Sequence, residues 1–299
     1  MKEELNDRKI NMATERPGFG EEQSSKIEYL QERSAEFNEA LNGLDLELIK
    51  RLIQEEALKS GREKGSNLNF LDQGRIGEIE ARGHESSMPI SFYNSATNEI
   101  EVDFNGLAEQ AERQNPFLTK EGLKAYLVAV LIHEELHAAT ELQALGYVGY
   151  QHFRSYQVWN EGVTEKLARE LTEKYYKTTA DFSQYDQSKS YNYESAVLLL
   201  DVVIAKLSAA TGFDQQTVWN AIKRGMFENT SLESKELQEL FEQTLPADFF
   251  KNLRTANPLN ETEIHTLIEK MNQGSLEKIV TRLIKFLHFE KPTDSRKAA

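Results

Sequence analysis

The chain of 299 residues contains no cysteine, which excludes both disulfide bonds and thiolate metal ligands. Any metal site must therefore use histidine and carboxylate ligands. The sequence also lacks an apolar run of transmembrane length and an apolar segment after Met1. It predicts neither a membrane span nor a signal peptide, so we expect a cytoplasmic protein with no membrane partner, with export by another route as the open alternative.

Basic residues are scarce relative to acidic ones. Lys and Arg number 35 against 49 Asp and Glu, which gives a formal net charge of −14 and argues against a nucleic-acid partner. Neither a G-x-x-x-x-G-K nor a G-x-G-x-x-G nucleotide motif is present. Apolar residues make up 39%, which is enough for a sizeable core in one large domain or two modest ones.

The two ends of the chain lack hydrophobic periodicity. We expect disordered tails over residues 1–24 and 291–299, where charged and polar residues predominate. Residues 25–180 are expected to contain N-terminal helices, a small sheet and the helices of the motifs described below. Residues 181–290 show repeated helical spacing and predict a helical C-terminal lobe.

Two helices and a hairpin are predicted before residue 105. Apolar residues at helical spacing predict one helix from about Ser25 to Gly43 and a second one that Asp45 caps. The stretch PISFYNSATNEIEVDF, residues 89–104, contains two short apolar runs around a turn-like segment. This pattern is typical of a β-hairpin.

The motif HEELH closes a long apolar helical run that begins after Thr119. His133 and His137 are four residues apart, so on a helix they project from one face and can chelate one divalent metal ion. Glu134 lies close enough to handle a water molecule at that metal. The alternative is a buried histidine pair without a metal, and the pentapeptide alone does not decide between the two.

A third ligand is expected in the segment VWNEGVTE, which opens the next helical run. Glu161 and Glu165 share one helical face there. Two like charges four residues apart destabilise a surface helix slightly. A metal ligand and a carboxylate that orients another ligand would have a reason to lie together. Glu141, one turn past His137, is a competing candidate for the third ligand.

HEELH followed by WNEGVTEKLA resembles the gluzincin clan of zinc metallopeptidases, which includes thermolysin and the membrane-alanyl-type aminopeptidases. The latter carry a similar W-L-N-E-G-F-A segment. The resemblance implies that His133, His137 and Glu161 bind Zn²⁺. It also implies that Glu134 is the general base and that Glu165 orients a ligand histidine. The spacer between the two motifs is a few residues longer here than in those families.

A further segment, YNYESA, extends the resemblance. The aminopeptidases of this clan have a Y-E-K-G-A stretch at the corresponding place, whose tyrosine hydroxyl hydrogen-bonds the oxyanion. This implies a catalytic role for Tyr193, with Tyr191 as the alternate; a packing role is the competing interpretation. Glu141 has no counterpart in the resemblance, which places it below Glu161 as a ligand.

The resemblance implies a fold of the α+β class that is mostly α-helical: a zincin-like core with a small N-terminal sheet, an active-site helix and a helical C-terminal lobe. In that architecture the edge strand of the sheet pairs with an extended substrate. The implied activity is zinc-dependent hydrolysis of peptide bonds in a peptide or protein substrate, with Glu134 as the base. The sequence has no G-A-M-E-N segment, which favours an endopeptidase over an aminopeptidase.

Two other functions remain open from the sequence. One is a catalytically inactive or regulatory metal-binding protein that uses the HExxH unit for partner interaction. The other is a helical interaction protein in which the pentapeptide is accidental. The absence of bound metal after purification would favour the helical interaction protein over both the metallopeptidase and the regulatory metal-binding protein.

Overall fold

The fold is described from a computed structural model of the chain. The tails predicted at residues 1–24 and 291–299 lie outside the described residues, as do Tyr191 and parts of the predicted C-terminal lobe. The structure describes residues 32, 34–61, 75–78, 90–114, 120–142, 147–148, 150–152, 155–179, 193–233, 245 and 248–273.

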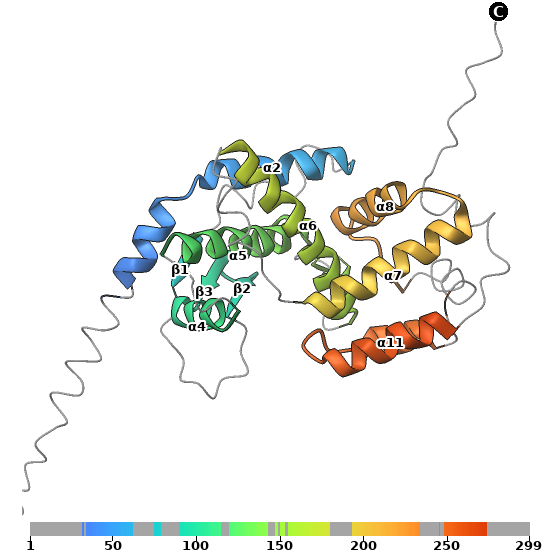
Figure 1. Cartoon of the computed structure of the whole chain (residues 1–299). Coiled ribbons are helices and arrows are strands. Elements are labelled where there is room, and N and C mark those ends of the chain that lie inside the picture. Colours follow the sequence, from blue (N-terminus) through green and yellow to red (C-terminus); the bar gives the residue numbers. More distant parts are fainter. Residues whose placement is uncertain are drawn as a thin grey trace, which may run out of the picture.

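Helices dominate the described part of the chain, and residues 34–42 are also helical. The expectation of an α+β fold that is mostly α-helical is confirmed. Two long helices, α5 and α6, lie at its centre (Figure 1). The named helices are α2 (Leu46–Lys59), α4 (Phe104–Gln114), α5 (Lys120–Thr140), α6 (Gln157–Thr178), α7 (Glu194–Thr211), α8 (Gln215–Phe227), α10 (Phe249–Thr255) and α11 (Glu261–Gln273).

A three-stranded sheet with the order β1-β3-β2 precedes the central helices. Strands β2 (Ser91–Asn94) and β3 (Glu99–Val102) pair antiparallel, which confirms the predicted hairpin. Asn98 turns the chain between them with a φ of 57°, a left-handed conformation that asparagine tolerates better than most residues. Strand β1 (Arg75–Glu78) pairs parallel with β3 and was not predicted.

A second, smaller sheet lies in the spacer between the two sequence motifs. Its strands are β4 (Glu141–Leu142), β5 (Tyr147–Val148) and β6 (Gln151–His152), all antiparallel. Strand β4 begins directly where α5 ends. The extra length of the spacer is therefore partly ordered as strand rather than as open loop.

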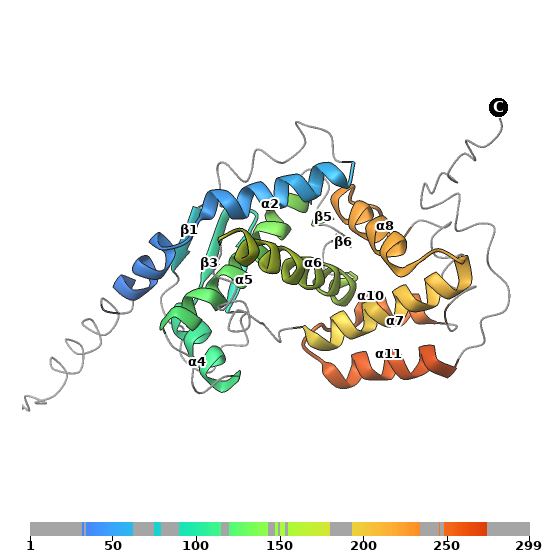
Figure 2. The same ribbon diagram turned by 45° about the horizontal axis from the view of Figure 1, so that its top comes forward.

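Helix α5 is the centre of the core. Between Ala125 and Thr140 every residue except Ala129 is buried. The sheet lies on one side of α5, and α2 and α6 cover other sides (Figures 1 and 2). A helix covered on several sides needs apolar residues nearly all round, which explains why the sequence here is a continuous apolar run rather than a stripe.

Helix ends follow the local signals in the sequence. The Asp45 carboxylate accepts a hydrogen bond from the Leu48 backbone N–H at 2.9 Å, so it caps α2 as predicted. Gly212 ends α7 with a φ of 74°, a conformation that glycine adopts without steric cost. Among the described residues no single helix has the length and hydropathy of a membrane span, although the sharply bent pair α7 and α8 passes that test together.

A buried ion pair joins α2 and α8. Lys223 Nζ lies 2.5 Å from Glu56 Oε1, and both side chains are almost fully buried. Lys174 of α6 lies 3.4 Å from the other Glu56 oxygen. Burial alone would raise the pKa of Glu56, but Lys223 and then Lys174 lower it by more, so the pKa is below its usual value and the carboxyl is ionised.

We expect Lys223→Met to lower the free energy of unfolding by about 3 kcal/mol, because it leaves the buried Glu56 carboxylate without its nearest cation. Urea unfolding at neutral pH measures the loss. Lys177→Met is the matched control, since it removes an exposed pair with Glu173 on α6 and should cost no more than about 0.5 kcal/mol. Equal, small losses for both variants would show that the buried pair is not stabilising.

Candidate metal centre

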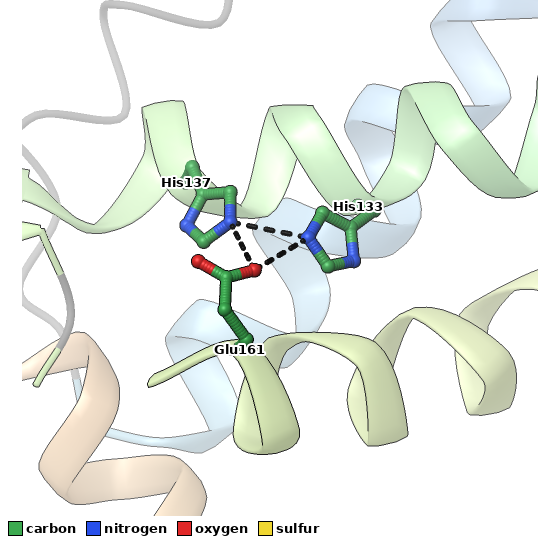
Figure 3. A group of neighbouring side chains, drawn as sticks. All are labelled: His133, His137 and Glu161. Carbon is green, nitrogen blue, oxygen red and sulfur yellow. Dashed lines mark hydrogen bonds and ion pairs between the residues drawn. The ribbon is translucent and has the colours of Figure 1, made fainter. Parts of the chain in front are cut away.

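Three potential metal ligands from α5 and α6 converge on one point (Figure 3). The Nε2 atoms of His133 and His137 are 3.2 Å apart. Glu161 Oε2 lies 3.2 Å from His133 Nε2 and 3.4 Å from His137 Nε2. Both histidines are buried, and Glu161 is largely buried. The three residues predicted as ligands are thus brought together.

The local sequence explains how the triad forms. The two histidines share a face of α5 because they are four residues apart. Glu161 lies just over one turn into α6, and the start of this helix is anchored by the residue before it. Tyr156 is buried, its backbone N–H donates to the Arg254 carbonyl at 3.0 Å, and its ring packs edge-on against Phe250.

The spacing of the three atoms fits a tetrahedral metal ion. For bonds of about 2.0–2.1 Å to nitrogen or oxygen, the corners of a tetrahedron lie about 3.3–3.4 Å apart. The distances in the triad are 3.2, 3.2 and 3.4 Å. Two imidazoles and a carboxylate are also a ligand set that suits zinc. The residues present therefore fit a metal site of this kind.

Glu165 holds His133 in the orientation that a metal ligand needs. Its Oε2 lies 3.0 Å from His133 Nδ1. A carboxylate only accepts, so Nδ1 carries a proton, and Nε2 is the ring nitrogen that can bind a metal ion. Glu165 is buried, and its other oxygen accepts a hydrogen bond from Arg169 Nε at 2.9 Å. The resemblance implied this orienting role for Glu165, whereas a role for Arg169 was not predicted.

The electrostatics of the triad favour a bound cation. Burial lowers the pKa of His133, but hydrogen bonds to Glu161 and Glu165 outweigh it and raise the pKa well above its usual value. Burial raises the pKa of Glu161, while the charges and hydrogen bonds of His137 and His133 outweigh it and hold the pKa well below its usual value. Glu161 is therefore ionised, as a metal ligand must be.

A residue of the three-stranded sheet binds the Glu134 side chain. The Ser91 hydroxyl on β2 donates a hydrogen bond to Glu134 Oε1 at 2.7 Å, and the Glu134 side chain is buried. The negative charge of Glu134 contributes to raising the pKa of both His133 and Tyr193, so it lies near both of them. The sequence offered no signal for Ser91, because a contact between residues 43 positions apart leaves no periodic pattern.

Tyr193 lies against the triad. Its ring stacks on the His133 imidazole with a centroid distance of 5.5 Å and an angle of 18° between the planes. Burial raises the pKa of Tyr193, and the charges of Glu161 and Glu134 raise it further, so the hydroxyl stays protonated and can donate a hydrogen bond. The alternate, Tyr191, lies outside the described residues.

Gly162 allows the helices that carry these residues to approach closely. A Cβ atom at this position would lie only 2.7 Å from the Ala196 carbonyl oxygen in the first turn of α7. Real Cβ atoms essentially never come so close to another heavy atom. The glycine that follows Glu161 therefore permits the contact that brings Tyr193 beside His133.

Glu141, the competing ligand candidate, is engaged elsewhere. It is buried, and its Oε2 accepts a hydrogen bond from the Tyr93 hydroxyl at 2.6 Å. Within the part of the chain that the structure describes, the cluster of potential ligands contains His133, His137 and Glu161 but not Glu141.

Comparisons of the chain with known protein families, curated proteins and solved structures found no significant match. The resemblance to the gluzincins therefore rests on the motif residues alone. What carries the interpretation of the site is its own geometry: two histidines on one helix, a glutamate on the next, and a second glutamate behind the first histidine.

We expect the purified protein to contain about one zinc ion per chain, because one three-ligand group is found among the residues that the structure describes. Glu161→Gln should weaken zinc binding by more than about 100-fold, because it removes a ligand rather than an outer partner. Elemental mass spectrometry and chelator competition measure both. Glu141→Gln is the matched control and should keep its zinc; loss of zinc in that variant, with retention in Glu161→Gln, would assign the third ligand to Glu141.

Proposed function

We propose that the protein is a zinc-dependent metallopeptidase that hydrolyses peptide bonds within chains. The observation that carries the proposal is the triangle of His133, His137 and Glu161 ligand atoms, with separations of 3.2 to 3.4 Å. Glu134 and Tyr193 lie beside this triangle, and each has a chemistry that a hydrolytic zinc site uses.

A zinc ion in the triad would supply Lewis acidity, which lowers the pKa of water and polarises a carbonyl group. Glu134 is the base that accepts a proton from the water and returns it to the leaving amine. The Ser91 hydroxyl keeps the Glu134 carboxylate in one orientation, because it binds one of the two oxygens. The other oxygen is then available for the proton.

Tyr193 is the electrophilic partner in this proposal. Its hydroxyl is protonated at neutral pH, as that of an ordinary tyrosine is, and burial and neighbouring carboxylates raise its pKa further. It can therefore donate a hydrogen bond to the oxyanion that develops on the substrate carbonyl. Glu165 keeps His133 oriented by accepting its Nδ1–H, as outer-shell carboxylates do for metal-bound histidines.

The position of β2 supports an extended peptide as substrate. Strand β2 lies at one edge of its sheet and, within the described residues, has a partner strand on one side only. It packs against α5, and its first residue, Ser91, contacts Glu134. A peptide that pairs with this edge would place its backbone next to the proposed base. Such binding requires no chain terminus, which favours cleavage within the chain.

We expect Glu134→Gln to keep its zinc and to lower kcat by about 10²- to 10⁴-fold, because it removes the general base but no metal ligand. Mass spectrometry of a peptide library after incubation detects cleavage, and elemental analysis of the same samples reports zinc. Full activity in the variant would refute the role of Glu134. A wild-type protein that holds zinc but cleaves nothing would instead support a metal-binding protein without catalysis.

Tyr193→Phe tests the oxyanion role separately. The variant keeps the ring that stacks on His133 and loses only the hydroxyl, so zinc binding and KM should be unchanged. We expect kcat to fall by about 10²- to 10³-fold, the usual effect of losing one oxyanion donor. Steady-state kinetics on a peptide found in the library screen give both constants, and an unchanged kcat would assign Tyr193 to packing.

A further inference from the structure

Arg169 connects two carboxylates that belong to different helices. Its Nε donates to Glu165 Oε1 at 2.9 Å, within α6. Its Nη1 lies 2.8 Å from Glu194 Oε2, at the first residue of α7. The Arg169 side chain is 30% exposed and that of Glu194 is 58% exposed, whereas Glu165 is buried. One guanidinium group thus joins the buried Glu165 to the exposed Glu194.

Both ends of this bridge lead back to His133. Glu165 uses its second oxygen to hold His133 Nδ1 at 3.0 Å. Glu194 directly follows Tyr193, whose ring stacks on His133. The contacts form a closed circuit that runs from His133 through Glu165, Arg169 and Glu194 to Tyr193 and back.

The backbone at Tyr193 needs such external support. Tyr193 precedes α7 with a φ of 56°, a left-handed conformation that is costly for a residue with a bulky side chain. Its side chain makes no capping hydrogen bond to the helix that it begins. The Arg169 bridge and the close approach of Gly162 to Ala196 hold this end of α7 against α6. Further along α7, Asp201 pairs with Lys166 of α6 at 3.0 Å.

Arg169 also offsets the electrostatic repulsion between carboxylates near the site. Glu161 lies on the same helix as Glu165, and Glu134 is close to His133, so several carboxylates crowd this region. Without a cation, Glu165 and Glu194 would repel each other across the helix boundary. Arg169 replaces that repulsion with two charge-assisted hydrogen bonds.

We propose that Arg169 is a positioning residue that holds Tyr193 over His133 by tying the first turn of α7 to Glu165. The inference rests on the proposed metal centre and on the proposed role of Tyr193. It differs from a merely stabilising ion pair, which would change the free energy of unfolding but would leave the distance between Tyr193 and the metal unaltered.

The position of Tyr193 can be measured without any activity assay. The protein is labelled with 3-fluorotyrosine at its 11 tyrosines and loaded with Co²⁺ in place of zinc. The ¹⁹F resonance of Tyr193 is assigned as the one absent in Tyr193→Phe. Because Co²⁺ is paramagnetic, it displaces the resonance of a nearby fluorine strongly and that of a distant one weakly.

Two variants cut the bridge at different points. Arg169→Met removes the guanidinium, and Glu194→Ala removes the exposed carboxylate while leaving Arg169 on Glu165. We expect each to reduce the cobalt-induced displacement of the Tyr193 resonance by at least about two-fold, because the charge-assisted tie to α7 is lost. Glu194→Ala should fold normally even if Arg169→Met does not, because the side chain that it removes is largely exposed. Lys177→Met, which breaks an exposed pair on the same helix, should behave as wild type.

The outcomes separate this inference from the proposed function. A wild-type protein that binds no Co²⁺ overturns the metal centre, and this inference with it. A wild-type displacement that both bridge variants retain in full overturns only the role of Arg169. The role of Arg169 is supported if both bridge variants reduce the displacement and Lys177→Met retains the full wild-type displacement.

Kinetics supply a second readout. Arg169→Met should lower kcat by about 10- to 100-fold with KM unchanged, because a small misplacement of a catalytic group is costly. In a protein that already carries Tyr193→Phe, Arg169→Met should cause no further loss, since both changes act through the same hydroxyl. Arg169→Lys should restore only part of the rate, as lysine keeps the charge but not the two-armed geometry. Fully additive losses would contradict the inference.

Discussion

The packing of α5 against α6 is the contact on which the site depends. It places Glu161 against two histidines that already share a face of α5, and it places Glu165 behind the first of them. Ionisable groups buried this deeply are tolerated only when each one has partners. The helix contact supplies those partners, so the packing of the core and the assembly of the site are one event.

Three glutamates of the site differ in role because they differ in partners. Glu161 faces two imidazole Nε2 atoms and is available to a cation. Glu165 is occupied by N–H donors on both oxygens and therefore fixes orientation. Glu134 has one oxygen held by a hydroxyl from the sheet. The same side chain can thus serve as ligand, support and proposed base within two adjacent helices.

Local signals in the sequence predicted much of this arrangement. Helical spacing, the Asp45 cap and the hairpin turn depend on residues within a few positions of each other, and all three were found. Non-local contacts left no such trace: the parallel pairing of β1 with β3 and the bond from Ser91 to Glu134 join segments that no periodicity connects. Arg169 was recoverable in principle, because it lies four residues after Glu165, the spacing of a helical ion pair.

Gly162 shows how a motif can preserve information that is not local. A glycine after a functional glutamate is easily read as a sign of a flexible loop, yet this one lies inside α6 with its missing side chain facing α7. The absence of a side chain at Gly162 allows α6 and α7 to lie close together. The glycine of N-E-G is therefore required by a contact with a helix more than 30 residues further along the chain. That contact determines how near Tyr193, which precedes α7, can come to the histidines.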